Sequence, residues 1–177
     1  VLNGVDVVLE SVRVDGQTWP AGSYQKTDET LTLPNVSESF FLEISVKIKP
    51  QENTSLEGLY KSSSYFTTQC EAQGFRKITY FMDRPDVMST YTVHIEADEK
   101  KYPVLLSNGD LIRTEKRPEG RKVVTWKDPH KKPCYLFALV AGVLVSREQR
   151  IVSRSGHEHT LQVYVRPGDL DKTEHAM

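Results

Sequence analysis

The sequence has little of what marks several common classes of protein. Its 177 residues include 23 Lys and Arg against 24 Asp and Glu, and the formal net charge is -1. Nucleic-acid-binding domains usually carry a basic excess or a basic cluster, so nucleic acid is not an expected partner. The longest apolar run, Cys134–Val145, is far shorter than the about 20 residues that span a bilayer. We therefore expect no membrane association, and the run predicts one buried strand or two.

Cysteine is also scarce. Cys70 and Cys134 are the only two, and they do not form a closely spaced pair. One disulfide would fit, but their unlike surroundings favour two buried free thiols in a reducing compartment. The chain starts at Val1 without methionine and without the basic and apolar regions of a signal peptide. These features predict a piece of a longer, cytoplasmic protein.

Alternation of apolar and polar residues is the clearest structural signal. It runs through Leu42–Ile48 until Pro50, and it returns in Tyr91–Ala97, Val124–Trp126 and Leu161–Val165. A period of two is typical of antiparallel strands with one buried face and one face in solvent. A chain of this length fits one domain and buries enough surface to form a core without metal or disulfides.

The turn residues agree with strands. Asp15-Gly16 and Asn108-Gly109 each separate two apolar segments, and such dipeptides predict tight hairpins. No segment has a clear apolar stripe at helical spacing, and the only candidate helix is the tail, Gly168–Met177. Strand-like segments separated by Pro and Gly predict an all-β antiparallel β-sandwich.

The residue types that carry chemistry occur in unpromising settings. His157 and His159 are two apart in a Ser- and Gly-flanked segment, which favours a solvated hairpin over a metal site. His94 is expected on the polar face of a strand, and His130 in a solvated turn between prolines. Nothing near Cys70 indicates an activated nucleophile. No phosphate-binding loop and no G-x-S-x-G motif is present. We predict neither a catalytic residue nor a metal ligand in this chain.

Residues 58–86 fit a core strand poorly, because polar residues interrupt a segment rich in aromatics and hydroxyls. Places where local rules fail are often functional. Within this segment, Asp83–Asp86 has two interpretations. In the structural one, which we favour over substrate contact, a carboxylate caps a turn, Pro85 fixes its shape, and Arg84 packs or pairs across it.

Several blocks of this sequence are familiar as a set. They occur in one order over nearly the whole chain: Leu56–Tyr60, Thr68–Arg76, Ile78–Asp86, Tyr102–Gly109, Lys132–Gly142, Arg154–Gly156 and Leu161–Val165. Together they resemble the N-terminal domain of the bacterial aminopeptidase N family, the zinc-dependent gluzincin aminopeptidases.

The resemblance implies a four-domain exopeptidase in which an N-terminal β-sandwich packs against a thermolysin-like catalytic domain. Zinc ligands in such relatives come from H-E-x-x-H and a downstream glutamate, and this sequence has no H-E-x-x-H. We therefore expect zinc to be bound by a catalytic domain of the same parent chain. The resemblance also implies a sandwich over 1–166, shortened at its N-terminus, and the start of a connection over 167–177.

The resemblance implies a role in substrate binding for two residues. The acid of the Gln-Cys-Glu-Ala stretch, Glu71, matches a family acid that binds the α-amino group of the peptide, and Gln69 matches a position that lines the pocket for the first side chain. On an extended segment both would point the same way. Relatives hold the peptide bond after this acid in the cis form, with Arg76 and Asp83–Asp86 as candidates for its support. The expected partners are the catalytic domain of the same chain and peptide N-termini, and the 177 residues alone are expected to have no peptidase activity.

Two other functions remain open from the residues. A free-standing β-sandwich binding module for carbohydrate or protein predicts an exposed aromatic platform around Trp19 or Trp126. A purely structural docking domain predicts that Glu71 is dispensable.

Overall fold

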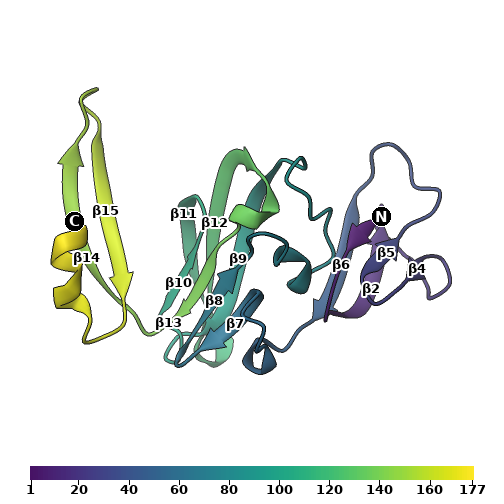
Figure 1. Ribbon diagram of the computed structural model, residues 1–177, viewed down its shortest axis with the longest axis horizontal. Coiled ribbons are helices and arrows are strands. Elements are labelled where there is room, and N and C mark those ends of the chain that lie inside the picture. The colour runs from purple at the N-terminus through teal and green to yellow at the C-terminus, as the bar shows by residue number, and fades with distance from the viewer.

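The chain folds into small antiparallel sheets joined by turns, as the computed structural model of all 177 residues shows (Figure 1). This confirms the all-β antiparallel fold. The strands are β1 (Leu2–Asn3), β2 (Val8–Val14), β3 (Gln17–Thr18), β4 (Gln25–Lys26), β5 (Thr30–Thr32), β6 (Leu42–Lys47), β7 (Gly58–Ser62), β8 (Tyr65–Gln69), β9 (Ser89–Asp98), β10 (Val104–Ser107), β11 (Asp110–Arg117), β12 (Arg121–Lys132), β13 (Leu139–Gly142), β14 (Val145–Val152) and β15 (Glu158–Val165). The 3₁₀ turns are η1 (Pro50–Glu52), η2 (Phe75–Lys77), η3 (Pro118–Gly120), η4 (Cys134–Leu136) and η5 (Leu170–Ala176). None of these helical segments is long and apolar enough to cross a membrane.

The N-terminal part consists of two three-stranded sheets with a shared core. Their strand orders are β1-β5-β4 and β3-β2-β6. Val12 of β2 and Leu31 of β5 are fully buried in the same apolar cluster. The predicted alternation in Leu42–Ile48 is confirmed, because its apolar side chains pack against this cluster while Glu43 and the intervening polar residues are exposed.

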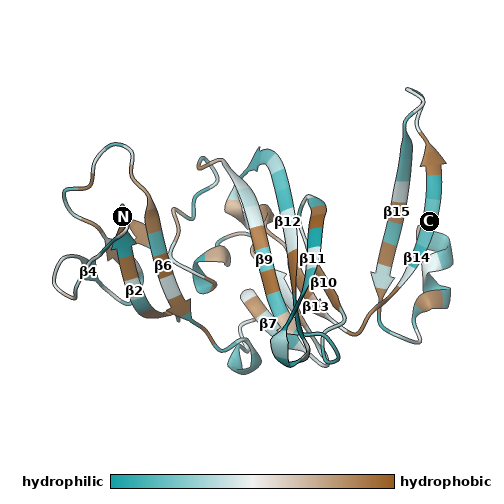
Figure 2. Cartoon of the chain, turned by 180° about the vertical axis from the view of Figure 1, so that it is seen from behind, coloured by the Kyte–Doolittle hydropathy of each residue, from teal (hydrophilic) through white to brown (hydrophobic).

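Two larger sheets form the middle of the molecule, with strand orders β10-β13-β8-β7 and β11-β12-β9. A second core joins them, since Leu105 and Ala141 of one sheet cluster with Ile95 and Val124 of the other. Figure 2 shows the alternation of apolar and polar residues along β9 that this packing requires. Strand β12 departs from the predicted alternation of buried and exposed residues, because Val123, Val124 and Thr125 are consecutive and all buried.

A third cluster connects these two parts. Cys70, Phe75 and Cys134 are buried in it, and Phe81 and Phe137 pack edge-on against the Phe75 ring at centroid distances of 5.1 and 5.2 Å. Phe81 also exchanges two backbone hydrogen bonds with Asn3 of β1, at 2.7 and 3.0 Å. The segment around η2 is therefore fixed to both parts of the fold.

The C-terminal segment stands apart from the sheets. Strands β14 and β15 form a two-stranded hairpin, η5 packs beside it, and Figure 1 places both at one end of the molecule. The strand predicted at Leu161–Val165 is confirmed within β15, but β14 is its only partner. Thr173 is the single buried residue from Val143 to Met177. The predicted helical tail is a 3₁₀ segment.

The two predicted hairpin turns have different outcomes. Asp15-Gly16 joins β2 to β3, and both residues have positive φ, 50° and 79°, as a tight hairpin requires. The hairpin predicted at Asn108-Gly109 is wrong, because β10 pairs with β13 whereas β11 pairs with β12. The chain passes there from one sheet to the other, and the Asn108 side chain bonds the Leu136 carbonyl and the Ala138 N–H.

Candidate functional site

The segment that carries Glu71 is a tight turn at the end of β8. Strand β8 ends at Gln69, the Gly74 N–H donates to the Cys70 carbonyl at 2.8 Å, and η2 begins at Phe75. The Glu71–Ala72 peptide bond is cis, as the resemblance implied. We call residues 70–74 the Glu71 turn. Cys70 and Gly74 at its two ends are buried, whereas Glu71 is exposed.

Gln69 and Glu71 lie together, although the extended geometry assumed for them ends at Gln69. Both side chains are exposed, and the Gln69 side-chain amide donates to the Glu71 carbonyl at 3.4 Å. The Glu71 carboxylate has no hydrogen-bond or ion-pair partner in the chain. It is thus a free acceptor on a turn with buried ends.

A glycine fixes the path of the chain beneath this turn. Gly58 of β7 pairs with Gln69 of β8 and has a φ of 72°, which favours glycine. A Cβ at Gly58 would lie 2.8 Å from Lys77 Cβ and 3.0 Å from the Gly74 carbonyl oxygen. The close approach of β7 to the Glu71 turn and η2 therefore excludes a side chain here.

Asp83 is the buried acid of this region, with 2% of its side chain exposed. Its Oδ2 accepts hydrogen bonds from the Arg76 backbone N–H at 3.1 Å and from Arg76 Nε at 2.8 Å. Its Oδ1 accepts one from Cys134 Sγ at 3.0 Å. Arg76 Nη2 also donates to the Asp83 carbonyl at 3.1 Å. Both carboxylate oxygens are occupied within the fold.

The structural interpretation of Asp83–Asp86 is confirmed for Asp83, in an unexpected form. Arg84 pairs with Asp86 at the surface, with Nε and Oδ1 3.3 Å apart. Asp83 instead bonds the 3₁₀ turn seven residues earlier in the chain. An acid directly after the apolar run Tyr80-Phe81-Met82 was the sequence signal for this burial.

The cysteines confirm the prediction of two buried free thiols. Burial, helped by the Asp83 charge, raises the pKa of Cys70 to about 12. Burial and the hydrogen bond to Asp83 raise the pKa of Cys134 to about 12 as well. Both thiols are protonated at neutral pH, so Cys70 is unsuited to act as a nucleophile.

Tyr91 completes this cluster from β9. Its hydroxyl is buried and has no hydrogen-bond partner. Burial raises the pKa of Tyr91 to about 12, and the nearby Cys134, Asp83 and Cys70 contribute in the same direction. Burying a hydroxyl without a hydrogen-bond partner costs free energy of folding. The Tyr91 ring packs edge-on against Phe75, so the position of Tyr91 is determined by ring packing and not by a bond of its hydroxyl.

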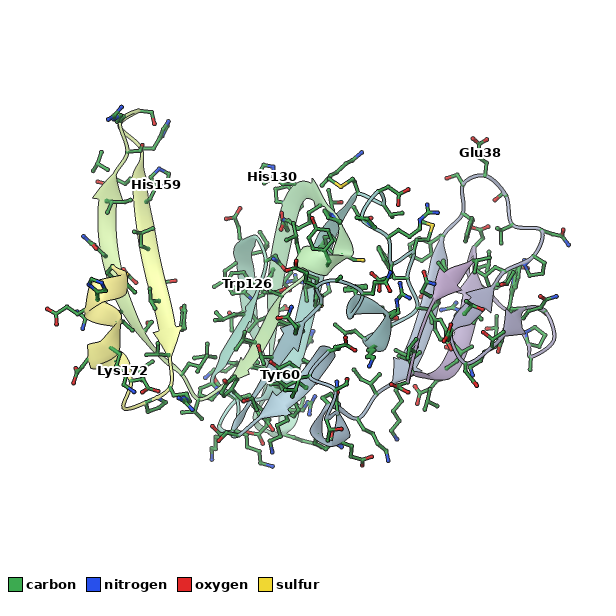
Figure 3. All side chains as sticks on the ribbon, viewed as in Figure 1. Glu38, Tyr60, Trp126, His130, His159 and Lys172 are labelled. Carbon is green, nitrogen blue, oxygen red and sulfur yellow. The ribbon has the colours of Figure 1, made fainter.

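The histidines lie apart from the Glu71 turn. His159 is on the exposed hairpin and His130 is exposed on β12, as Figure 3 shows. His157 is exposed in the hairpin turn, and His94 faces the polar side of β9, where its Nδ1 bonds Thr125 Oγ1 at 2.9 Å. His94, His157 and His159 lie where they were predicted. His130 is exposed as predicted, but it belongs to strand β12 and not to a turn. No group of three or more His, Cys, Asp or Glu in the chain could hold a metal ion.

The two tryptophans do not form the exposed platform that a carbohydrate-binding module would need. Trp126 is half-buried against the core of the two larger sheets, and its indole N–H donates to the Leu105 carbonyl at 3.0 Å. Trp19 is half-buried against the N-terminal core. Each ring is used in packing, and they belong to different clusters.

Comparison with known proteins defines the class of this fold. Residues 2–136 match the family model of the Peptidase M1 N-terminal domain. The chain belongs to this family, which confirms the resemblance read from its sequence. Its Glu71 turn and Asp83 both lie within the matched residues.

Individual relatives agree with the family. The chain is 47% identical to aminopeptidase N of Escherichia coli and 46% identical to that of Caulobacter vibrioides, over 99% and 100% of its length. It spans only 20% of each of these relatives. Among solved structures, Legionella pneumophila aminopeptidase A in complex with aspartic acid superposes with a TM-score of 0.93 at 36% identity, over 98% of this chain and 20% of that one. An M1 zinc metallopeptidase from Deinococcus radiodurans shares the fold, with a TM-score of 0.77 at 19% identity, over 94% of this chain and 39% of that one.

Proposed function

We propose that this chain is the substrate-end-recognition domain of a cytoplasmic, zinc-dependent aminopeptidase. In this proposal Glu71 binds the α-amino group of the peptide, and Gln69 forms part of the pocket for the first side chain. Zinc and the catalytic residues belong to a catalytic domain of the same parent chain. Residues 1–166 form the domain, and residues 167–177 begin the connection to that catalytic domain.

The observation that carries the proposal is the setting of the Glu71 carboxylate. It is exposed and unpaired, yet the turn that bears it has buried ends and is braced by hydrogen bonds on both sides. A recognition group needs such an arrangement, since it must be free to bind and already held in position. The identity to aminopeptidases N over the whole chain supports the same role.

The chemistry of the ligand explains why an acid is suitable. The α-amino group of a peptide has a pKa of about 8, so it is largely an ammonium at neutral pH, with three donors and no acceptor. A carboxylate forms charge-assisted hydrogen bonds with it, which are stronger than neutral ones. An internal peptide bond offers no such cation. Glu71 would thus restrict the enzyme to chain ends and place the first peptide bond at a set distance from the catalytic centre.

The residues present do not fit zinc, because no cluster of ligands exists in the chain. We therefore assign no metal-dependent step to it and predict that the 177 residues alone are inactive. The purified chain should not hydrolyse an alanyl or arginyl chromogenic amide. Chelator-sensitive hydrolysis that co-elutes with the chain in gel filtration would disprove this assignment.

The test of Glu71 uses the full-length parent enzyme. Glu71→Gln keeps the size of the side chain and removes its charge, so it should lower kcat/KM for a free-amine peptide by about 10- to 100-fold, the value of a hydrogen bond to a charged group. Glu38→Gln is the control, because Glu38 is an exposed glutamate on the loop between β5 and β6 (Figure 3). Equal kcat/KM values for Glu71→Gln and the control would exclude Glu71 from substrate binding, and the chain would then be a structural docking domain.

A further inference from the structure

We propose that Asp83 is a positioning residue for the amine-binding acid. It holds the Glu71 turn in its recognition geometry through Arg76 and Cys134, without touching the peptide itself. This inference rests on the proposed role of Glu71. It adds a second, buried carboxylate to the machinery of substrate recognition.

The geometry of Asp83 differs from that of an ordinary surface acid. Its two oxygens receive three hydrogen bonds, two from Arg76 and one from Cys134. These donors come from two separate 3₁₀ turns, since Arg76 belongs to η2 and Cys134 begins η4. One side chain therefore fixes the position of two separate 3₁₀ turns relative to each other.

The position of these turns sets the position of Glu71. Arg76 is two residues after Gly74, and Gly74 closes the Glu71 turn by its hydrogen bond to Cys70. The Gly74 carbonyl then accepts the Lys77 N–H at 3.0 Å, so the turn continues directly into η2. Cys70, at the other end of the turn, shares the buried cluster with Cys134. A movement of η2 would therefore move Glu71 as well.

Stability alone is a weak reason to keep this buried charge. Burying an ion pair costs desolvation that its attraction often fails to offset, and apolar residues of similar volume usually do as well. The Asp83 and Arg76 side chains are 2% and 20% exposed, so the pair is largely desolvated. Directed hydrogen bonds, in contrast, fix an orientation that apolar packing does not. We infer that orientation of the Glu71 turn is what Asp83 provides.

The test is a double-mutant cycle in the full-length parent, with Glu71→Gln and Asp83→Asn alone and combined. If Asp83 acts through Glu71, Asp83→Asn lowers kcat/KM on the order of tenfold in the wild-type background and by less than about twofold when Glu71→Gln is already present. A general structural role would lower it equally in both backgrounds, and that result would overturn the inference. Asp86→Asn is the matched control, because Asp86 pairs with Arg84 at the surface.

A second pair of variants decides the matter if Asp83→Asn does not fold. Cys134→Ala removes a donor to Asp83, whereas Cys134→Ser keeps one in the same place. The inference predicts a rise in KM for the alanine variant that the serine variant reverses, and an unchanged KM in both would refute it.

The results also separate the inference from the proposed function on which it rests. If Glu71→Gln itself leaves kcat/KM unchanged, the proposed function fails first. If Glu71→Gln is impaired and the Asp83 effect is additive, only the present inference fails.

Discussion

Gly74 lies directly against the end of β8, so that a Cβ on it would be 2.4 Å from the Gln69 carbonyl oxygen. Its backbone angles, φ -80° and ψ -18°, are those of an ordinary right-handed residue. Glycine is therefore required here by space and not by an unusual conformation. The residue that closes the Glu71 turn cannot accept a side chain unless backbone atoms shift.

Replacement of Gly74 should therefore disturb the turn. Gly74→Ala is expected to destabilise the chain by about 1–3 kcal/mol, the usual cost of overpacking. In the parent enzyme it should also lower kcat/KM, because the backbone beside Gln69 must move. Urea unfolding and steady-state kinetics provide the measurements. Gly120→Ala is a useful comparison, since a Cβ there meets no atom within 4 Å, although its φ of 70° adds strain. Wild-type kinetics for Gly74→Ala would show that the turn has more room than we describe.

The hydroxyl of Tyr91 should be dispensable. It is buried without a partner among Cys70, Cys134 and Asp83, so removing it relieves a desolvation cost. Tyr91→Phe is expected to increase the free energy of unfolding by about 1 kcal/mol. The midpoint of urea unfolding measures this, with Tyr60→Phe on β7 as a half-buried control. A clear loss of stability in Tyr91→Phe would mean that the hydroxyl makes a bond we have not identified.

Alkaline pH should weaken the fold through the two thiols. Their pKa rises from 9.0 to about 12 in the folded chain. Above pH 9 the unfolded state loses these protons while the folded state keeps them. The unfolded state then binds fewer protons than the folded state, so the free energy of unfolding falls as pH rises from about 9 to about 12. Below pH 9 the stabilisation by the two protonated thiols is fully present.

Unfolding by urea at pH 8 and at pH 10.5 measures this loss. The Cys70→Ala/Cys134→Ala double variant should have a lower stability at pH 8 but a flatter dependence on pH. Parallel pH dependences for the double variant and the wild type would place the titrating groups elsewhere.

The β14–β15 hairpin should be the least stable part of the isolated chain. Isolated two-stranded hairpins are marginally stable in water, and this one has η5 as its main neighbour and leaves Val152 67% exposed. Its amide hydrogens should exchange with solvent much faster than those of β9 and β12. Hairpin amides that exchange as slowly as those of β12 in the isolated chain would contradict this.

The sequence was informative wherever a local pattern determined the structure. The period of two located β6 and β9, and Asp15-Gly16 located its turn, because residue spacing and positive φ are local properties. The hairpin predicted at Asn108-Gly109 was wrong because these residue types fit a hairpin turn, whereas the pairing of each strand depends on residues far along the chain. The alternation predicted for β12 failed for the same reason, since Thr125 is paired with His94 of the neighbouring β9, a residue 31 positions earlier in the chain.

The candidate site divides in the same way. Glu71 and Gln69 could be named from the resemblance, and their exposure agrees with that choice. The surroundings of Asp83 could be predicted only in part. The resemblance made Arg76 and Asp83–Asp86 candidates to support the turn, but the bond from Cys134 depends on the folding of η2 and η4 around one apolar cluster. An acid directly after an apolar run was visible in the sequence, but its burial and its hydrogen bond from Cys134 were not.

The central claim is that the charge of Glu71 recognises the free start of a peptide. Isothermal titration of the full-length enzyme with a non-hydrolysable peptide analogue, free or Nα-acetylated, tests it most directly. We predict that the wild type strongly prefers the free amine and that Glu71→Gln reduces this preference by about tenfold or more, with little change for the acetylated ligand. The same preference in wild type and variant would contradict the claim.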